Sequence, residues 1–207
     1  MKTSSRLLAT PAFAFGVLFV VMSATAELRA QAETKPETPT PAETAKKPAA
    51  DPELTATDET MIKEIKKHAE QCSEAQMKMD FDKILPYVPK KLLELMGGPE
   101  ILKTKLAQGN AELKRRGVTI DAAIIGTPEK PQKHDGILAS LVPMTTKLTT
   151  PQGKLVATSH MIAVSEDKGA SWVFVDTATV NEEKLGTLYP ALKGKIKIPP
   201  ATAKMAE

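Results

Sequence analysis

Asp176 has the neighbours in this sequence that a general base needs. Trp172, Phe174 and Asp176 alternate within the segment SWVFVDT, so their side chains point to one face if the segment is a strand. Apolar surroundings raise the pKa of a carboxyl group and can bring it into the range of acid–base catalysis. The alternative, which we favour, is a structural role in which Asp176 accepts hydrogen bonds from the backbone of the following turn.

His160 and Tyr87 are the side chains that could act together with Asp176. Both faces of the segment around His160 are largely apolar, so this residue is either an acid–base group or, as we favour, a structural histidine. Tyr87 lies where prolines interrupt a helix, and it either donates a hydrogen bond at a cavity mouth or simply packs with its hydroxyl in water. We therefore name Tyr87, His160, Trp172 and Asp176 as candidate ligand-binding residues and assign no catalytic residue.

His68 and Cys72 are four residues apart, a spacing that brings two side chains together on a helix. A nucleophilic pair also needs an exposed thiolate and a third, orienting group. Cys72 lies on the expected apolar face, which favours a buried and inert thiol. Two residues are too few ligands for a dedicated zinc site, so we expect no metal and no cofactor.

Six methionines lie within the expected folded region, and their thioethers either adapt to an apolar ligand or fill an irregular core. Core filling is the interpretation that we favour, because most of them follow helical apolar spacing. They are Met61, Met77, Met79, Met96, Met144 and Met161.

The composition excludes several classes of protein. The chain has 207 residues, one cysteine and a formal net charge of +3. One cysteine cannot form an internal disulfide, and so small a charge lacks the basic footprint of a nucleic-acid-binding protein. The length fits one domain of ordinary size with additional segments.

The first 32 residues have the pattern of an export signal. Lys2 and Arg6 precede an apolar stretch at 12–22, which is short for a membrane-spanning helix and is followed by small residues. Cleavage after Ala26 or after Ala32 fits the pattern, and we favour Ala32; an uncleaved anchor is the alternative. Cleavage after Ala32 removes three basic residues and one acidic residue, so the net charge falls from +3 to +1. We expect an exported protein, periplasmic or secreted, without a stable membrane anchor.

Residues 33–56 are rich in proline, threonine, glutamate and alanine and contain almost no large apolar side chain. Such a segment cannot bury enough surface to offset the entropy of ordering it. We expect a disordered linker here.

The folded domain at 57–190 is expected to have helices first and strands afterwards. Apolar residues recur at helical spacing in four segments, which begin near Asp58, Asp80, Lys90 and Pro99. Alternation then predicts four strands at 118–124, 137–149, 154–165 and 171–177. A short helix at 182–189 precedes a flexible C-terminal tail at 191–207.

Short connections between consecutive strands predict an antiparallel meander, so the fold class is α+β, with the helices packed on one side of a curved four-stranded sheet. His134-Asp135-Gly136 supplies a hairpin turn before the second strand. Pro143 is expected to form a bulge that bends the sheet, because proline cannot donate to the ladder. In the first strand, Ile120, Ala122 and Ile124 are expected to share one face.

Two stretches carry a family resemblance: HAEQCSEAQMKMDFDKILPYVPKKLLELMGG (68–98) and SHMIAVSEDKGASWVFVDT (159–177). With three helices ahead of a long curved meander, residues 57–190 resemble the nuclear transport factor two-like superfamily, also described as SnoaL-like or cystatin-like, and within it small exported members. The resemblance implies a cone whose wide mouth often holds a small apolar ligand. Some members are isomerases, dehydratases or hydrolases, many others only bind or associate, and dimerisation through the open sheet face is common.

These observations predict an exported single-domain module that binds a small apolar ligand or another envelope protein, with a homodimer through the open sheet face as a further possibility. The alternative is a proton-transfer isomerase or hydrolase that uses Asp176 as the base, with His160 or Tyr87 as its partner. The enzyme hypothesis requires these side chains to converge on one cavity.

Overall fold

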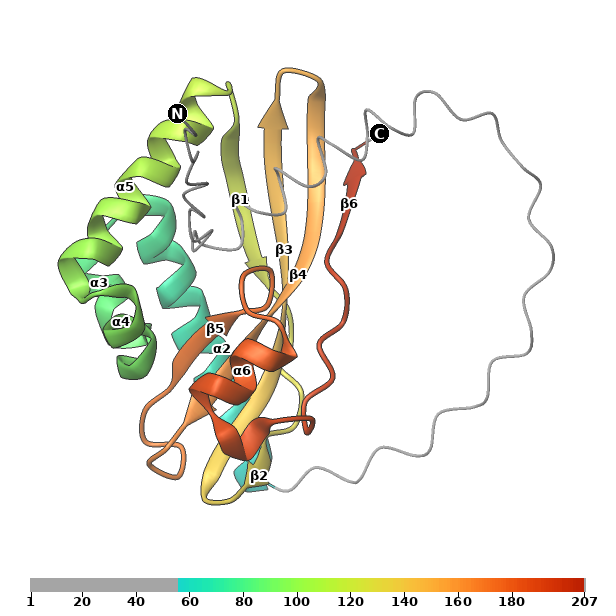
Figure 1. Cartoon of the computed structure of the whole chain (residues 1–207). Coiled ribbons are helices and arrows are strands. Elements are labelled where there is room, and N and C mark those ends of the chain that lie inside the picture. Colours follow the sequence, from blue (N-terminus) through green and yellow to red (C-terminus); the bar gives the residue numbers. More distant parts are fainter. Residues whose placement is uncertain (1–55, 207) are drawn as a thin grey trace, which may run out of the picture.

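The computed structural model describes residues 56–206 (Figure 1). The export signal predicted at 1–32, and all but the last residue of the linker predicted at 33–56, lie outside the described residues. Within the described range, every helix is too short or too polar to cross a membrane.

Five α-helices and two short 3-10 helices form in the described chain. They are α2 (Ala56–Lys78), α3 (Phe81–Ile84), η1 (Leu85–Tyr87), α4 (Lys90–Met96), α5 (Pro99–Arg115), α6 (Glu182–Leu188) and η2 (Pro190–Leu192). The apolar stripe of α2 is buried at Ile65, Ala69 and Cys72, as the 3–4 spacing predicts. Gly97, with a φ of 94°, ends α4 in a left-handed conformation that glycine adopts without strain.

Six strands form one antiparallel sheet in the described chain: β1 (Thr119–Ile125), β2 (Gln132–His134), β3 (Ile137–Thr150), β4 (Gly153–Ser165), β5 (Val173–Asp176) and β6 (Thr202–Met205). The predicted α+β class is confirmed. The four predicted strands are present as β1, β3, β4 and β5 and lie in that order in the sheet. The prediction of four strands is corrected to six, because β2 and β6 also pair.

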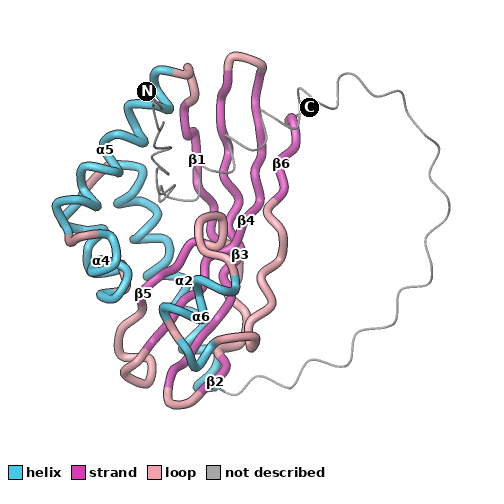
Figure 2. The backbone as a smooth tube through the Cα atoms, viewed as in Figure 1, coloured by secondary structure: helices cyan, strands magenta, loops and turns pink. Residues whose placement is uncertain are grey.

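The long hairpin of β3 and β4 is the spine of the sheet (Figure 2). At one end of this hairpin, β1 pairs with β3 and β6 pairs with β4. At the other end, β2 pairs with β3 and β5 pairs with β4. The predicted turn at Asp135 and Gly136 has positive φ angles of 46° and 90°, and it joins β2 to β3.

The predicted bulge at Pro143 is wrong, since β3 and β4 pair without a register shift along their whole length. The carbonyl of Pro143 accepts a hydrogen bond of 2.8 Å from Gly126 N, so its backbone edge faces the end of β1. In an antiparallel ladder the N–H and C=O of one residue point to the same neighbour. The missing N–H of Pro143 therefore costs the β3–β4 ladder nothing.

The sheet has its bulge in β1, where the register shifts between Ile120 and Ala122 and Asp121 is the extra residue. Beyond the bulge, Ile125 is buried in the core under α2, whereas Ile124 is 48% exposed. The prediction that Ala122 and Ile124 share the face of Ile120 is therefore wrong. One extra residue reverses the alternation of every side chain that follows it.

Helices cover both faces of the sheet, over different areas, so the prediction that the helices pack on one side is wrong. On the face that we call the α2 face, α2 packs on a core of Val142, Met144, Met161, Ala163, Trp172 and Phe174. On the opposite face, which we call the α6 face, α6 and η2 pack on Leu141, Ile162, Val164 and Val175. Figure 1 shows α2 and α5 together beside the sheet and α6 near the end that holds β5.

The C-terminal segment predicted at 191–207 to be a flexible tail packs on the domain. Leu192 is fully buried, and Ile196 and Ile198 pack against the same core as α6. β6 then pairs with residues 155–158 of β4, the part of that edge which β5 does not reach. The prediction is corrected for this segment, because β6 satisfies backbone groups that would otherwise form an open sheet edge.

Candidate functional site

His160 and Asp176 lie on opposite faces of the sheet. Asp176 pairs directly with Met161 across β4 and β5, and Met161 belongs to the core of the α2 face. Directly paired residues share a face and successive residues alternate, so His160 points to the α6 face. The structure therefore does not bring His160 and Asp176 to one cavity.

His160 is half-buried on the α6 face. Burial lowers the pKa of its imidazole, and the carboxylate of Glu129 acts in the opposite direction. Its buried Nδ1 has no hydrogen-bond partner among the described residues. His160 thus lacks the acidic partner that the enzyme hypothesis assigns to it.

Asp176 is engaged in the turn that follows β5. Its Oδ1 accepts a hydrogen bond of 2.9 Å from Ala178 N, and its main-chain carbonyl accepts one of 3.1 Å from Val180 N. This is the turn-capping role that we favoured from the sequence, and it is confirmed. The carboxylate also faces Cys72, whose thiol pKa is raised to about 12, first by burial and then by the negative charge of Asp176.

Tyr87 and Asp176 do meet at one cavity, on the α2 face. This cavity measures about 50 Å³ and is also lined by Cys72, Met161 and Phe174. The Tyr87 hydroxyl donates a hydrogen bond of 2.9 Å to Gln71 Oε1. Cavities that hold organic ligands measure about 300–1,000 Å³, so this one is far too small in the described conformation.

Trp172 is a core residue and lines neither the small cavity nor the larger one described below. Its side chain is 2% exposed and packs in the core of the α2 face. Its Nε1 has no hydrogen-bond partner within residues 56–206. In the same range, no three histidine, cysteine or acidic side chains are grouped so that they could hold a metal ion.

A larger cavity of about 520 Å³ lies between α2, α5 and the sheet, and we call it the α2–α5 cavity. α2 contributes its last turns and α5 contributes its second half, while β1 and β3 form the floor. Representative lining residues are Ser73, Met77, Leu106, Leu113, Ala123 and Met144. Its volume falls within the range of cavities that hold small organic ligands.

The polar groups of the α2–α5 cavity are neutral or basic. Ser73 and Thr146, which are 5% and 2% exposed, place hydroxyl groups in its lining. Lys78, Lys105 and Lys114 also line it, and no acidic residue of the described chain does so. A mainly apolar lining with cationic groups is complementary to a ligand that is mainly apolar and carries a negative charge.

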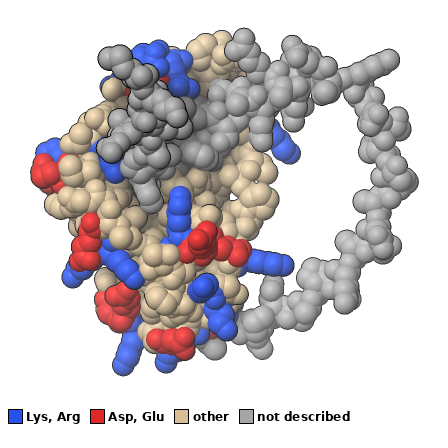
Figure 3. All heavy atoms as spheres, in the orientation of Figure 1, with Lys and Arg blue, Asp and Glu red and all other residues tan. Residues whose placement is uncertain are grey.

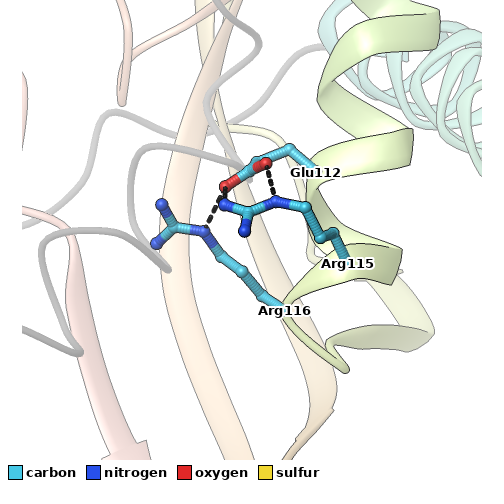
Figure 4. A network of polar contacts seen from close by, with 3 residues as sticks. All are labelled: Glu112, Arg115 and Arg116. Carbon is cyan, nitrogen blue, oxygen red and sulfur yellow. Dashed lines mark hydrogen bonds and ion pairs between the residues drawn. The ribbon is translucent and has the colours of Figure 1, made fainter.

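Nearby carboxylates are already paired with basic side chains. Glu112, on α5, accepts hydrogen bonds from Arg115 and Arg116, which lower the pKa of its carboxyl to about 2 (Figure 4). Glu74 on α2 pairs with Lys78. Elsewhere, acidic and basic side chains are interspersed over the visible surface (Figure 3).

None of the four candidate residues named from the sequence lines the α2–α5 cavity. Three of the methionines that we interpreted as core, Met77, Met79 and Met144, line it. Met144 is also buried in the core of the α2 face, as we interpreted it. Met77 and Met79 are 44% and 36% exposed, which is unusual for core filling. One feature of the sequence could have pointed to this cavity. Gly109 and Asn110 are poor helix formers within α5, and both residues line the cavity.

Comparisons with known proteins identify no relative: no family model, no curated protein and no solved structure matches this chain. The resemblance to the nuclear transport factor two-like superfamily therefore stays a prediction.

Proposed function

We propose that this protein is an exported binding module that holds a small apolar ligand in the α2–α5 cavity. The observation that carries this proposal is the cavity itself, with about 520 Å³ between two helices and the sheet. Its methionine and leucine side chains can adapt to ligands of different shape. No covalent chemistry is needed for this function.

The arrangement of the candidate chemical groups also supports binding rather than catalysis. Asp176 is engaged by Ala178 N, and His160 lies across the sheet from it. The cavity shared by Tyr87 and Asp176 has about one tenth of the volume of the α2–α5 cavity. A substrate has no room beside these two residues.

Two broader features belong to the same proposal. Helices packed on the long β3–β4 hairpin fit a cone of the nuclear transport factor two-like kind, with the α2–α5 cavity as its interior. The pattern of residues 1–32 fits export. Together, a ligand-binding cone and export describe a module that carries or senses an apolar compound outside the cytoplasm.

A dye titration tests the proposal. N-phenyl-1-naphthylamine is uncharged, and its fluorescence rises in apolar surroundings. We expect saturable binding by the full chain, and we expect Ala123→Phe to weaken it at least tenfold, because Ala123 lines the cavity and the ring would occupy it.

Ala122→Phe is the matched control. Ala122 is the neighbour of Ala123 on β1, is also half-buried, and pairs with Lys147 on the opposite face of the sheet. Its dye affinity should equal that of the unaltered protein. Absence of saturable binding, or equal loss in both variants, would refute the proposed site.

A further inference from the structure

We infer that the ligand of the α2–α5 cavity is a single-chain anionic amphiphile, with an alkyl chain among the apolar residues and a carboxylate beside Lys105 or Lys114. This inference rests on the proposed function and specifies its ligand class. It follows from the charges around the cavity and from the shape of the groove that continues it.

The three lysines of the cavity come from two helices that face each other. Lys78 is in the last turn of α2, and its ammonium group already pairs with Glu74. Lys105 and Lys114 lie on α5, and no ion pair joins either of them to an acidic residue of the described chain. Two cations that form no ion pair within residues 56–206 therefore line a mainly apolar cavity.

An ammonium group beside apolar surface favours an anion over a neutral head group. Lys105 is half-buried, and a carboxylate would supply charge-assisted hydrogen bonds to its ammonium group. A cationic amphiphile would meet repulsion from Lys105 and Lys114.

The apolar surface is elongated, which fits an alkyl chain. A second hollow of about 400 Å³ runs along α5 beside α3 and shares Met79, Leu106, Asn110 and Lys114 with the α2–α5 cavity. Phe81 and Ile84 extend its apolar lining. Again, no acidic residue of the described chain lines it.

Competition against N-phenyl-1-naphthylamine on the full chain tests the head group. The probes are decanoate, decan-1-ol and decyltrimethylammonium, which share one chain length and differ in charge. We expect decanoate to compete at a concentration at least about fivefold below that of decan-1-ol, and decyltrimethylammonium to compete least. Octanoate should be weaker than decanoate by about tenfold, because two methylenes are lost from the apolar contact.

The double variant Lys105→Gln/Lys114→Gln should lose the preference for decanoate over decan-1-ol. The preference is measured as the ratio of the two competition constants on the same variant, so that any change in dye affinity cancels. Lys105→Arg/Lys114→Arg should retain the preference. Lys147→Gln/Lys154→Gln is the matched control, since it removes the same charge from β3 and β4 on the face away from α2, and it should also retain the preference.

The results separate this inference from the proposed function. If the dye binds and decanoate and decan-1-ol compete equally, the inference of an anionic head group is refuted, whereas the proposed apolar site is still supported. A preference that survives in Lys105→Gln/Lys114→Gln would overturn the assignment to these lysines. Competition by anionic phospholipid vesicles, but not by decanoate, would replace a free amphiphile by a membrane surface. Absence of dye binding to the unaltered protein would refute both proposals.

Discussion

The Oδ1 atom of Asp176 accepts a hydrogen bond from the backbone N–H of Ala178 at 2.9 Å. This contact closes the turn between β5 and α6, and it uses the carboxylate that the sequence offers as a general base. The carboxylate is therefore a structural group of the turn.

Asp176→Ala should lower the free energy of unfolding by about 1 kcal/mol, because Ala178 N loses its acceptor. Asp176→Asn keeps an oxygen at the same position and should cost less than half as much. Urea denaturation measures both values. Glu70→Ala removes an exposed carboxylate from α2 and serves as the control, with an expected change within about 0.5 kcal/mol. Equal stability of the Ala and Asn variants would contradict the capping role.

Cys72 should make the stability depend on pH in the alkaline range. Burial and the charge of Asp176 raise its thiol pKa from 9.0 to about 12 in the folded chain. Between these values the unfolded chain releases the thiol proton and the folded chain keeps it. The stability that the protonated Cys72 thiol contributes is therefore complete below pH 9 and is lost as the pH rises toward 12. Burial also raises the pKa of Tyr189, which acts in the same direction.

Urea denaturation at pH 7.5 and pH 10 measures this effect. The fall in unfolding free energy between the two pH values should be about 1.4 kcal/mol smaller in Cys72→Ala than in the unaltered protein. Tyr189 is intact in both proteins, so its contribution cancels. An identical fall in both would mean that the thiol is not protected by burial.

Hydrogen exchange tests the pairing of β6, the strand that the sequence analysis did not predict. Ala206 N donates to Lys154 O at 2.8 Å, so alternate residues before it also direct their N–H groups to β4. We expect slow exchange at Lys204 and Ala206 and fast exchange at Ala203 and Met205. Uniformly fast exchange of all four amides would contradict the pairing of β6 and support the prediction of a flexible tail.

The sequence predicted the helices and the strands β1, β3, β4 and β5 because their apolar residues follow a regular spacing. β2 has three residues and β6 has four, with Lys204 and Thr202 among them, so neither carries an alternating apolar pattern. Their positions depend on which parts of the β3–β4 edges other strands leave open. That is a tertiary property, which local spacing does not contain.

The candidate site was predicted less well, again for a physical reason. Alternation in β5 correctly placed Trp172, Phe174 and Asp176 on one face, but it could not show that this face is filled by α2. The bulge at Asp121 decides that Ala123 reaches the α2–α5 cavity. A single extra residue leaves no signal in composition or periodicity.

Methionine methyl NMR is the most direct test of the α2–α5 cavity as the binding site. The full chain, labelled with ¹³C at the methionine methyl groups, is titrated with N-phenyl-1-naphthylamine. We expect the resonances of Met77, Met79 and Met144, which line this cavity, to shift with saturation. Met96 and Met161, which line the small cavity beside Tyr87 and Asp176, should stay unchanged. Shifts at Met96 and Met161 without shifts at the methionines of the α2–α5 cavity would contradict the proposed site and would indicate binding beside Asp176.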